Sequence, residues 1–168
     1  MTKVVDSYRY IGGVTRRMVQ TWIKLEPERE IPWQPLTKPL SDCTVALLSS
    51  GGIALKTDEP FDQAGECENP WWGDPSYRKI PRTTQTEDIR VWHQHIDPTL
   101  GESDINCLLP IERLNELERL GKIGRSADTH YSTMGYVLNP TELLEQSVPD
   151  IINSLAADAV DLVVLVPA

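Results

Sequence analysis

The 168-residue sequence lacks the features of membrane, secreted and disulfide-rich proteins. No apolar run reaches the roughly 18 residues needed to cross a bilayer, and the first residues contain no apolar segment typical of a signal peptide. Only three cysteines are present, Cys43, Cys67 and Cys107, and no two of them form a CxxC pair. These absences predict a reduced, cytoplasmic protein.

Basic residues are also scarce, with 16 Lys and Arg against 25 Asp and Glu and a net charge of −9. This balance argues against nucleic acid as a partner. The first 24 residues are an exception, because they hold five basic residues and only one acidic residue. That segment is either a solvated helix surface or a docking face for an acidic partner. Neither GxGxxG nor a P-loop is present, so no nucleotide fingerprint is found.

The N-terminal part predicts a helix followed by an extended arm. Residues 6–25 enter a helix with apolar side chains at helical spacing. Residues 26–41 hold four prolines and cannot form a long element. We therefore expect residues 1–41 to form a helix and a Pro-rich arm that packs on a body, with 1–168 as a single α/β domain.

The body alternates between strand and helix patterns. Expected strands cover 44–48, 87–95, 104–110 and 162–167. Expected helices start near Pro110 and Asn139. The first is expected to end at Gly121 or Gly124, and the second to be broken or kinked by Pro149. Residues 57–85 contain four prolines and predict a long irregular loop. The alternation indicates an α/β fold with a single, mostly parallel sheet flanked by helices.

Two histidines stand out at the end of the second predicted strand. Residues i and i+2 of a strand share a face, so His93 and His95 are expected to point the same way near the carboxyl end, where open α/β sheets bind ligands. His130 follows in the loop "DTHYSTMG". The spacing is compatible with carboxylate binding or proton transfer, with a three-histidine zinc site, or with hydrogen-bonded structural histidines.

Two further segments are candidates for binding. Ser49, Ser50 and Gly51 follow the first predicted strand, where hydroxyls and backbone amides can hold an anion or simply form a tight turn. In "WWGDPSYR", Arg78 could bind a substrate carboxylate in a bidentate manner, while the adjacent tryptophans are equally typical of a lid or an interface. The residues alone give no complete catalytic set.

Seven segments together resemble one protein family over nearly the whole chain. They are "YRYIGGVTRRMV", "VALLSSGGIALKTDEPFD", "WWGDPSYRKIP", "IRVWHQHID", "DINCLLPIERLNEL", "GRSADTHYSTMGY" and "AVDLVVLVPA". In order and content they are similar to the selenoprotein component of glycine, sarcosine, betaine and D-proline reductases, and the short chain is more similar to the D-proline branch.

The resemblance implies reductive cleavage of a carbon–nitrogen bond alpha to a carboxylate. In that family a selenolate attacks the alpha carbon and a nearby thiol resolves the selenide. In the D-proline branch a pyruvoyl group on a partner subunit binds the substrate amine. A dithiol or protein thiol donor completes the cycle. The implied partners are therefore another reductase subunit, a thiol electron donor and a small amino acid, in an oligomer, with no metal and no cofactor held by this chain.

The resemblance also implies roles for individual residues. His93, His95 and Asp97 match the family's His-x-His-x-Asp stretch, and His130, Tyr131, Met134 and Gly135 match its "HYxxMG" stretch. We expect these residues to line the pocket with Ser49, Ser50, Gly51 and Arg78, and His93 or His130 to protonate the leaving amine.

In the family, the segment matching "LVPA" is followed at once by selenocysteine or cysteine. Residues 1–168 are therefore expected to be the N-terminal part of a longer chain, inactive alone and interrupted at a UGA codon after Ala168. The alternatives are a non-catalytic binding or scaffold subunit that ends natively at Ala168, and a histidine-dependent metal hydrolase.

Overall fold

The computed structural model describes residues 12–25, 30, 34–69, 72–135 and 137–168. Residues 1–36 and 37–168 form two compact units, which are considered separately. In the first unit, α1 (Gly13–Leu25) confirms the helix predicted within 6–25. Val14 and Met18, one turn apart on this helix, are both exposed. Much of the predicted Pro-rich arm, residues 26–29 and 31–33, lies outside the described residues.

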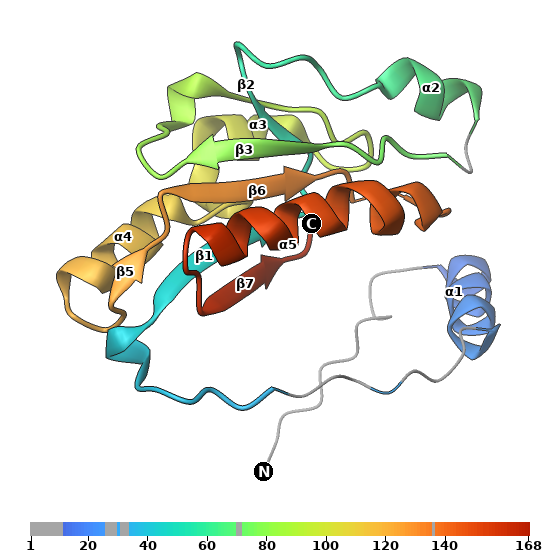
Figure 1. The fold of residues 1–168 in the computed structure, drawn as a ribbon. Coiled ribbons are helices and arrows are strands. Elements are labelled where there is room, and N and C mark those ends of the chain that lie inside the picture. Colours follow the sequence, from blue (N-terminus) through green and yellow to red (C-terminus); the bar gives the residue numbers. More distant parts are fainter. Residues whose placement is uncertain (1–11, 26–29, 31–33, 70–71, 136) are drawn as a thin grey trace. The chain divides into compact units, whose positions relative to one another are not determined.

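The second unit is built on a five-stranded sheet whose centre is β1 (Figure 1). The strands are β1 (Thr44–Ser49), β3 (Tyr77–Pro81), β5 (Arg125–Ser126), β6 (Thr129–Thr133) and β7 (Leu162–Val166). β5, β6 and β7 all run parallel to β1, and β3 runs antiparallel to β6. Because β5 and β7 both pair with Val45, they occupy opposite edges of β1. The α/β class with a mostly parallel sheet is therefore confirmed.

A second, two-stranded sheet comes directly before the segment with the histidines. Here β2 (Ile53–Leu55) pairs antiparallel with β4 (Ile89–Val91). The strand predicted at 87–95 is thus only three residues long, and both histidines follow it instead of lying within it. The strand is short because the last backbone hydrogen bond to the β2 segment is made by Trp92, which donates its N–H to Gly52 O at 2.8 Å. The chain turns after this residue.

Helices cover both faces of the main sheet, with α5 in front of it and α4 behind it in Figure 1. The helices of this unit are α2 (Gln63–Glu68), α3 (Pro98–Ser103), α4 (Ile111–Arg119) and α5 (Val148–Ala157), with short 3-10 turns η1 (Leu40–Asp42), η2 (Thr86–Asp88) and η3 (Ile105–Cys107). Gly121, with φ of 64°, follows the end of α4 as predicted. Among the described residues, no helix is long and apolar enough to span a membrane.

Four further expectations need correction. Residues 57–85 are not irregular throughout, since they contain α2 and β3. Residues 104–110 form the turn η3 and no strand, because the Asp104 side chain accepts the Asn106 N–H at 2.9 Å and caps it. Of the two outcomes expected at Pro149, a break is wrong, because a π-helical turn, η4 (Leu143–Ser147), leads directly into α5.

The fourth correction concerns the last strand, whose continuous apolar run predicts a buried strand. β7 has the predicted position, but it is only partly buried, and Leu165 is 69% exposed. Among the described residues it pairs with β1 alone and thus lies at the edge of the sheet. The buried core lies instead between β1, the second sheet and α4, and includes Val45, Leu47, Ile53, Ile89, Ile105, Leu109 and Ile111.

Candidate active site at the carboxyl edge of the sheet

The segments that follow three parallel strands meet at one edge of the main sheet. Ser49, the last residue of β1, is in register with Ser132 of β6 and Val166 of β7. The chain beyond each strand therefore leaves the sheet at the same level. A bridge between Gly51 and Met134 continues the contact past the strand ends. This edge is where open α/β sheets bind ligands.

The turn at Gly52 brings His93 to this edge. Gly52 donates its N–H to Thr133 O at 2.9 Å and accepts the Trp92 N–H at 2.8 Å, so it ties β6 to the end of β4. Its φ of 61° is a conformation that L side chains rarely adopt. A Cβ here would also lie 2.8 Å from Met134 Sδ and 3.0 Å from His93 N. Conformation and packing therefore both require glycine at this position.

Gly135 makes room for the His93 imidazole. A Cβ at Gly135 would lie 2.6 Å from Ser50 O and 2.7 Å from His93 Nε2. The ring is therefore packed against the Gly135 backbone, beside the carbonyl that follows β1. His93 is only 6% exposed. The structure thus brings together Ser50, Gly51, His93, Met134 and Gly135, all of which were predicted site residues.

The tautomer of His93 follows from its hydrogen bond. Nδ1 accepts the His95 N–H at 3.1 Å, so in the neutral ring the proton is on Nε2. Burial lowers the pKa of His93, and the nearby charge of His95 lowers it further. The neutral ring therefore presents an Nε2–H donor on the side of Ser50 and Gly135.

The two serines at the end of β1 accept hydrogen bonds from backbone groups. Ser49 is fully buried, and its Oγ accepts the Gly51 N–H at 3.0 Å. Ser50 donates its N–H to Val166 O at 3.1 Å, and its Oγ accepts the Ala168 N–H at 2.9 Å. Both hydroxyls thus accept backbone N–H groups of the turn and of the segment after β7.

His130 lies within the sheet, away from its edge. It is 0% exposed, and its Nδ1 accepts the Leu47 N–H at 3.2 Å. The imidazole thus takes the place of a strand carbonyl as acceptor for β1, between the residues that pair with β5 and those that pair with β6. Its Nε2 is 3.5 Å from Ser126 Oγ. Burial, followed by the charge of Arg82, lowers the pKa of His130 to about 4. The catalytic assignment of His130 stays a prediction, and its contacts are those of a structural histidine.

The other predicted residues have structural contacts of their own. Asp97 caps α3, accepting the Thr99 N–H at 2.9 Å and the Thr99 hydroxyl at 2.6 Å. These hydrogen bonds lower the pKa of Asp97. Tyr131 is buried, with its ring centroid 6.1 Å from that of Tyr77. His95 is exposed, and its ring centroid lies 5.9 Å from that of His93.

Arg78 uses its guanidinium to fix a loop. Nε donates to Glu59 O at 3.0 Å and Nη2 donates to Pro60 O at 3.1 Å. Nη1 donates to Ser76 Oγ and Tyr77 O, both at 2.9 Å. The guanidinium carbon also lies 4.1 Å from the centre of the Phe61 ring. Every nitrogen of the group is engaged, so a substrate carboxylate would have to displace these bonds.

Two glutamines that the sequence did not single out attach α2 to the histidine segment. Gln63 donates its Nε2 to Trp92 O at 2.5 Å, and Gln94 donates its Nε2 to Gln63 O at 2.8 Å. Cys67 Sγ lies 3.6 Å from Gln94 Oε1. No sequence signal could have identified this contact, because an isolated glutamine in an apparently irregular segment has no characteristic spacing.

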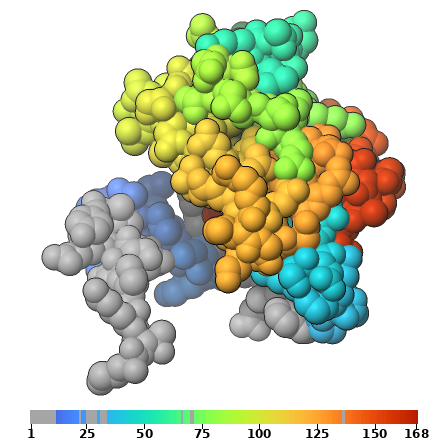
Figure 2. Space-filling model, turned by 90° about the vertical axis from the view of Figure 1, so that its left-hand side faces the viewer, coloured from blue at the N-terminus to red at the C-terminus, as the bar shows by residue number. Residues whose placement is uncertain are grey.

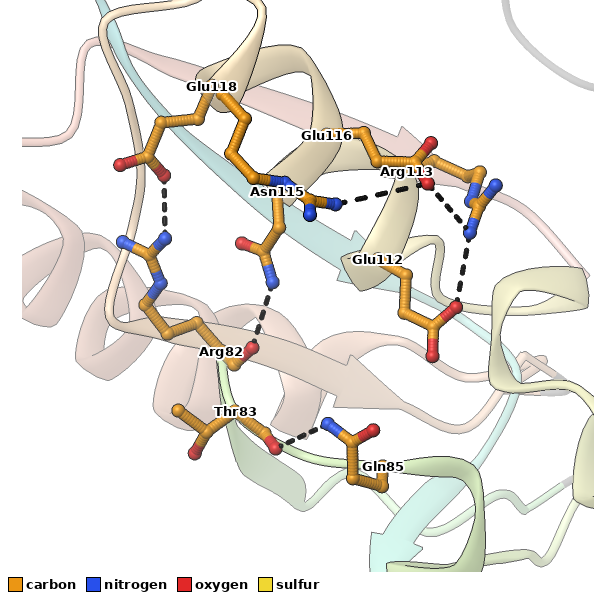
Figure 3. A pocket seen from close by; sticks show the side chains of 9 residues that line it. Arg82, Thr83, Gln85, Glu112, Arg113, Asn115, Glu116 and Glu118 are labelled. Carbon is orange, nitrogen blue, oxygen red and sulfur yellow. Dashed lines mark hydrogen bonds and ion pairs between the residues drawn. The ribbon is translucent and has the colours of Figure 1, made fainter.

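A cavity of about 510 Å³ lies elsewhere, between α4 and the turn after β3. Figure 2 shows the yellow and orange surface that includes α4, and Figure 3 shows the cavity's charged groups turned toward one another. Arg82 pairs with Glu118 at 2.6 Å, and Arg113 lies 3.1 Å from Glu116 and 3.2 Å from Glu112. Because its charges are paired and it contains no histidine or thiol, this cavity is a weaker candidate. Within the described ranges, no three His, Cys, Asp or Glu side chains gather as a metal site would require.

Comparison with known proteins gives consistent relatives. The family model for glycine/sarcosine/betaine reductase selenoprotein B matches residues 11–168. D-proline reductase subunit gamma of Acetoanaerobium sticklandii is 34% identical over 133 residues, covering 79% of this chain and 52% of that protein. Glycine reductase complex component B subunit gamma of Carboxydothermus hydrogenoformans is 31% identical over 138 residues, covering 80% of this chain and 30% of that protein.

Betaine reductase complex component B subunit beta of Peptoclostridium acidaminophilum is 28% identical over 128 residues, covering 76% of this chain and 28% of that protein. The chain thus spans about half the length of the D-proline reductase relative and about a third of the others. No solved structure matches significantly.

Proposed function

Because the chain belongs to the glycine/sarcosine/betaine reductase selenoprotein B family, we propose that it is part of a reductase that cleaves the carbon–nitrogen bond alpha to a carboxylate. D-proline is the first substrate to test, since the relative that is 34% identical is named a D-proline reductase subunit. Glycine, sarcosine and betaine follow from the family description and the other relatives.

The observation that carries this proposal is the meeting of His93, Ser50 and Gly135 where β1, β6 and β7 end. A buried N–H donor next to the end of β7 suits a reaction that needs a proton for the leaving amine. We propose that the redox residue, selenocysteine or cysteine, follows Ala168 in the full-length protein, which would place it at this edge.

The overall reaction consumes two electrons and two protons. The bond between the alpha carbon and nitrogen breaks, the alpha carbon gains a hydrogen, and the amine leaves with the other proton. Oxidation of a dithiol to a disulfide supplies both electrons and both protons. The pyruvoyl group proposed for a partner subunit would supply a carbonyl that holds the substrate amine, and the selenolate or thiolate would supply the nucleophile.

His93 would give the proton. At neutral pH its lowered pKa keeps the ring neutral, with the hydrogen on Nε2. A selenolate or thiolate brought next to the ring would raise the pKa of His93 by its negative charge, and the protonated ring would in turn stabilise that anion. The same imidazole can therefore stabilise the nucleophile first and protonate the amine afterwards.

The test is to express the full-length protein with its partner subunits and to supply dithiothreitol with each amino acid in turn. D-proline should be opened to a linear amino acid two hydrogens heavier, detected by mass spectrometry. Alternatively, glycine, sarcosine or betaine should release its amine. If the assembled complex turns over none of these compounds but still binds its partners, the chain is a non-catalytic subunit and the proposal is wrong.

A further inference from the structure

Ser50 is the residue that joins the end of β1 to the end of β7. The ladder between the two strands ends with the pair Ser49 and Val166. Beyond it, the Ser50 N–H donates to Val166 O at 3.1 Å and the Ser50 Oγ accepts the Ala168 N–H at 2.9 Å. Pro167 has no N–H, so Ala168 supplies the next backbone donor after Val166. The Ser50 hydroxyl thus extends the pairing where the backbone ladder cannot.

The same residue borders His93 on its other side. Ser50 O and His93 Nε2 would lie 2.6 Å and 2.7 Å from a single Cβ placed on Gly135. Both atoms therefore lie beside the same point, the Cβ position of Gly135. Ser50 thus lies between the backbone after β7 and the donor nitrogen of the His93 imidazole.

We infer that Ser50 is a positioning residue, whose hydroxyl holds residues 166–168 so that the next residue of the full-length chain lies against His93. This inference rests on the proposed function. It differs from the expectation that Ser50 binds substrate, because the contact that its hydroxyl oxygen makes is with a backbone group of this chain, the Ala168 N–H. Without that acceptor, only the bond to Val166 O remains and the backbone after it can shift. Displacements of about 1 Å in a reacting group cost about a hundredfold in rate.

The experiment compares two substitutions of the same shape in the full-length protein assembled with its partners. Ser50→Thr keeps the hydroxyl, and Ser50→Val replaces it with a methyl group. Ser103→Ala is the matched control, since this exposed serine on α3 also uses its hydroxyl for a local backbone bond, to Leu100 O at 2.8 Å. Melting temperatures show which variants fold, and only those variants are compared.

Two quantities are measured for each protein. The first is kcat and KM for the amino acid that is turned over. The second is the rate at which iodoacetamide alkylates the residue after position 168, followed from pH 5 to 9 by mass spectrometry. The second quantity needs no turnover and reports whether the reactive residue still lies beside an imidazole that stabilises its anion.

Ser50→Val should lower kcat by about ten- to a hundredfold with KM within about threefold of wild type, and should move the alkylation midpoint to higher pH. Ser50→Thr should keep both quantities near wild type, and Ser103→Ala should change neither. Equal behaviour of Ser50→Thr and Ser50→Val overturns the inference, as does an effect on KM alone, which would assign Ser50 to substrate binding. If wild type has no activity, the proposed function fails while the alkylation profiles still test Ser50.

Discussion

The buried His130 should make the stability of the protein depend on pH in a predictable way. Its ring is 0% exposed, and the Leu47 N–H occupies the Nδ1 lone pair. Burial lowers its pKa to about 4 from the ordinary 6.5. The neutral ring therefore carries its proton on Nε2. A second proton can be added only at Nδ1, which breaks the bond to Leu47 and places a charge on a buried ring, and both cost free energy.

The sign follows from proton linkage. As pH falls below 6.5, the unfolded chain binds a proton at His130 while the folded chain does not, so the free energy of unfolding decreases. The decrease continues until the folded pKa of about 4 is reached. The difference of about 2.5 pH units, at 1.36 kcal/mol each, amounts to about 3 kcal/mol.

The assay is urea denaturation at pH 7.5, 6.5, 5.5 and 4.5 for wild type and His130→Asn. The Asn carboxamide oxygen can accept the Leu47 N–H in place of Nδ1, but the side chain does not titrate. Carboxylates with lowered pKa, such as Asp97, contribute equally to both proteins, so the difference between the two profiles isolates His130. Wild type should lose about 2.5 kcal/mol more than His130→Asn between pH 7.5 and 4.5, because this range stops just above the folded pKa of about 4. Parallel profiles would show that His130 is not held neutral in the folded protein.

Two further predictions concern packing and charge. Gly135→Ala should destabilise the protein by about 1–3 kcal/mol, because the new Cβ would overlap a backbone carbonyl and the His93 ring. Gly13→Ala is the control and should not destabilise the protein, because its Cβ would have nothing within 4 Å. Equal melting temperatures for the two variants would contradict this packing. Glu118→Gln should cost about 1 kcal/mol in urea denaturation at pH 7.5. The Ser126 N–H and Arg82 hold the pKa of Glu118 below its usual range, and an unchanged midpoint would show that this cluster is not stabilising.

Two strands of the main sheet, β1 and β7, could be predicted because they are continuous apolar runs. Residues 44–48 and 162–167 contain almost only apolar side chains, the pattern of a parallel strand. By contrast, β3 has the sequence "YRKIP" with a single buried side chain, Ile80. It is held by antiparallel pairing with β6, which is a tertiary contact that no local pattern announces.

The site could be predicted in composition but not in geometry. The alternation from Ile89 to His95 suggested that both histidines share a face of one strand. The strand ends at Val91 instead, because His93 Nδ1 accepts the His95 N–H and the chain turns. Likewise, nothing in "DTHYSTMG" distinguishes a histidine within the sheet from one at its edge. Only the register of β6 against β1 places His130 beside Leu47 and Gly135 beside His93.

The most direct test of the account is to make the same substitution at both histidines and to measure kcat in the full-length assembled complex at pH 7.5. Asparagine keeps an acceptor at the position of Nδ1 and removes Nε2 in each case. His93→Asn should lower kcat about a hundredfold or more, the usual scale for loss of a proton-transfer group, while His130→Asn should stay within about threefold of wild type. The opposite result, with His130→Asn inactive and His93→Asn active, would contradict the placement of the active site at the carboxyl edge of the sheet.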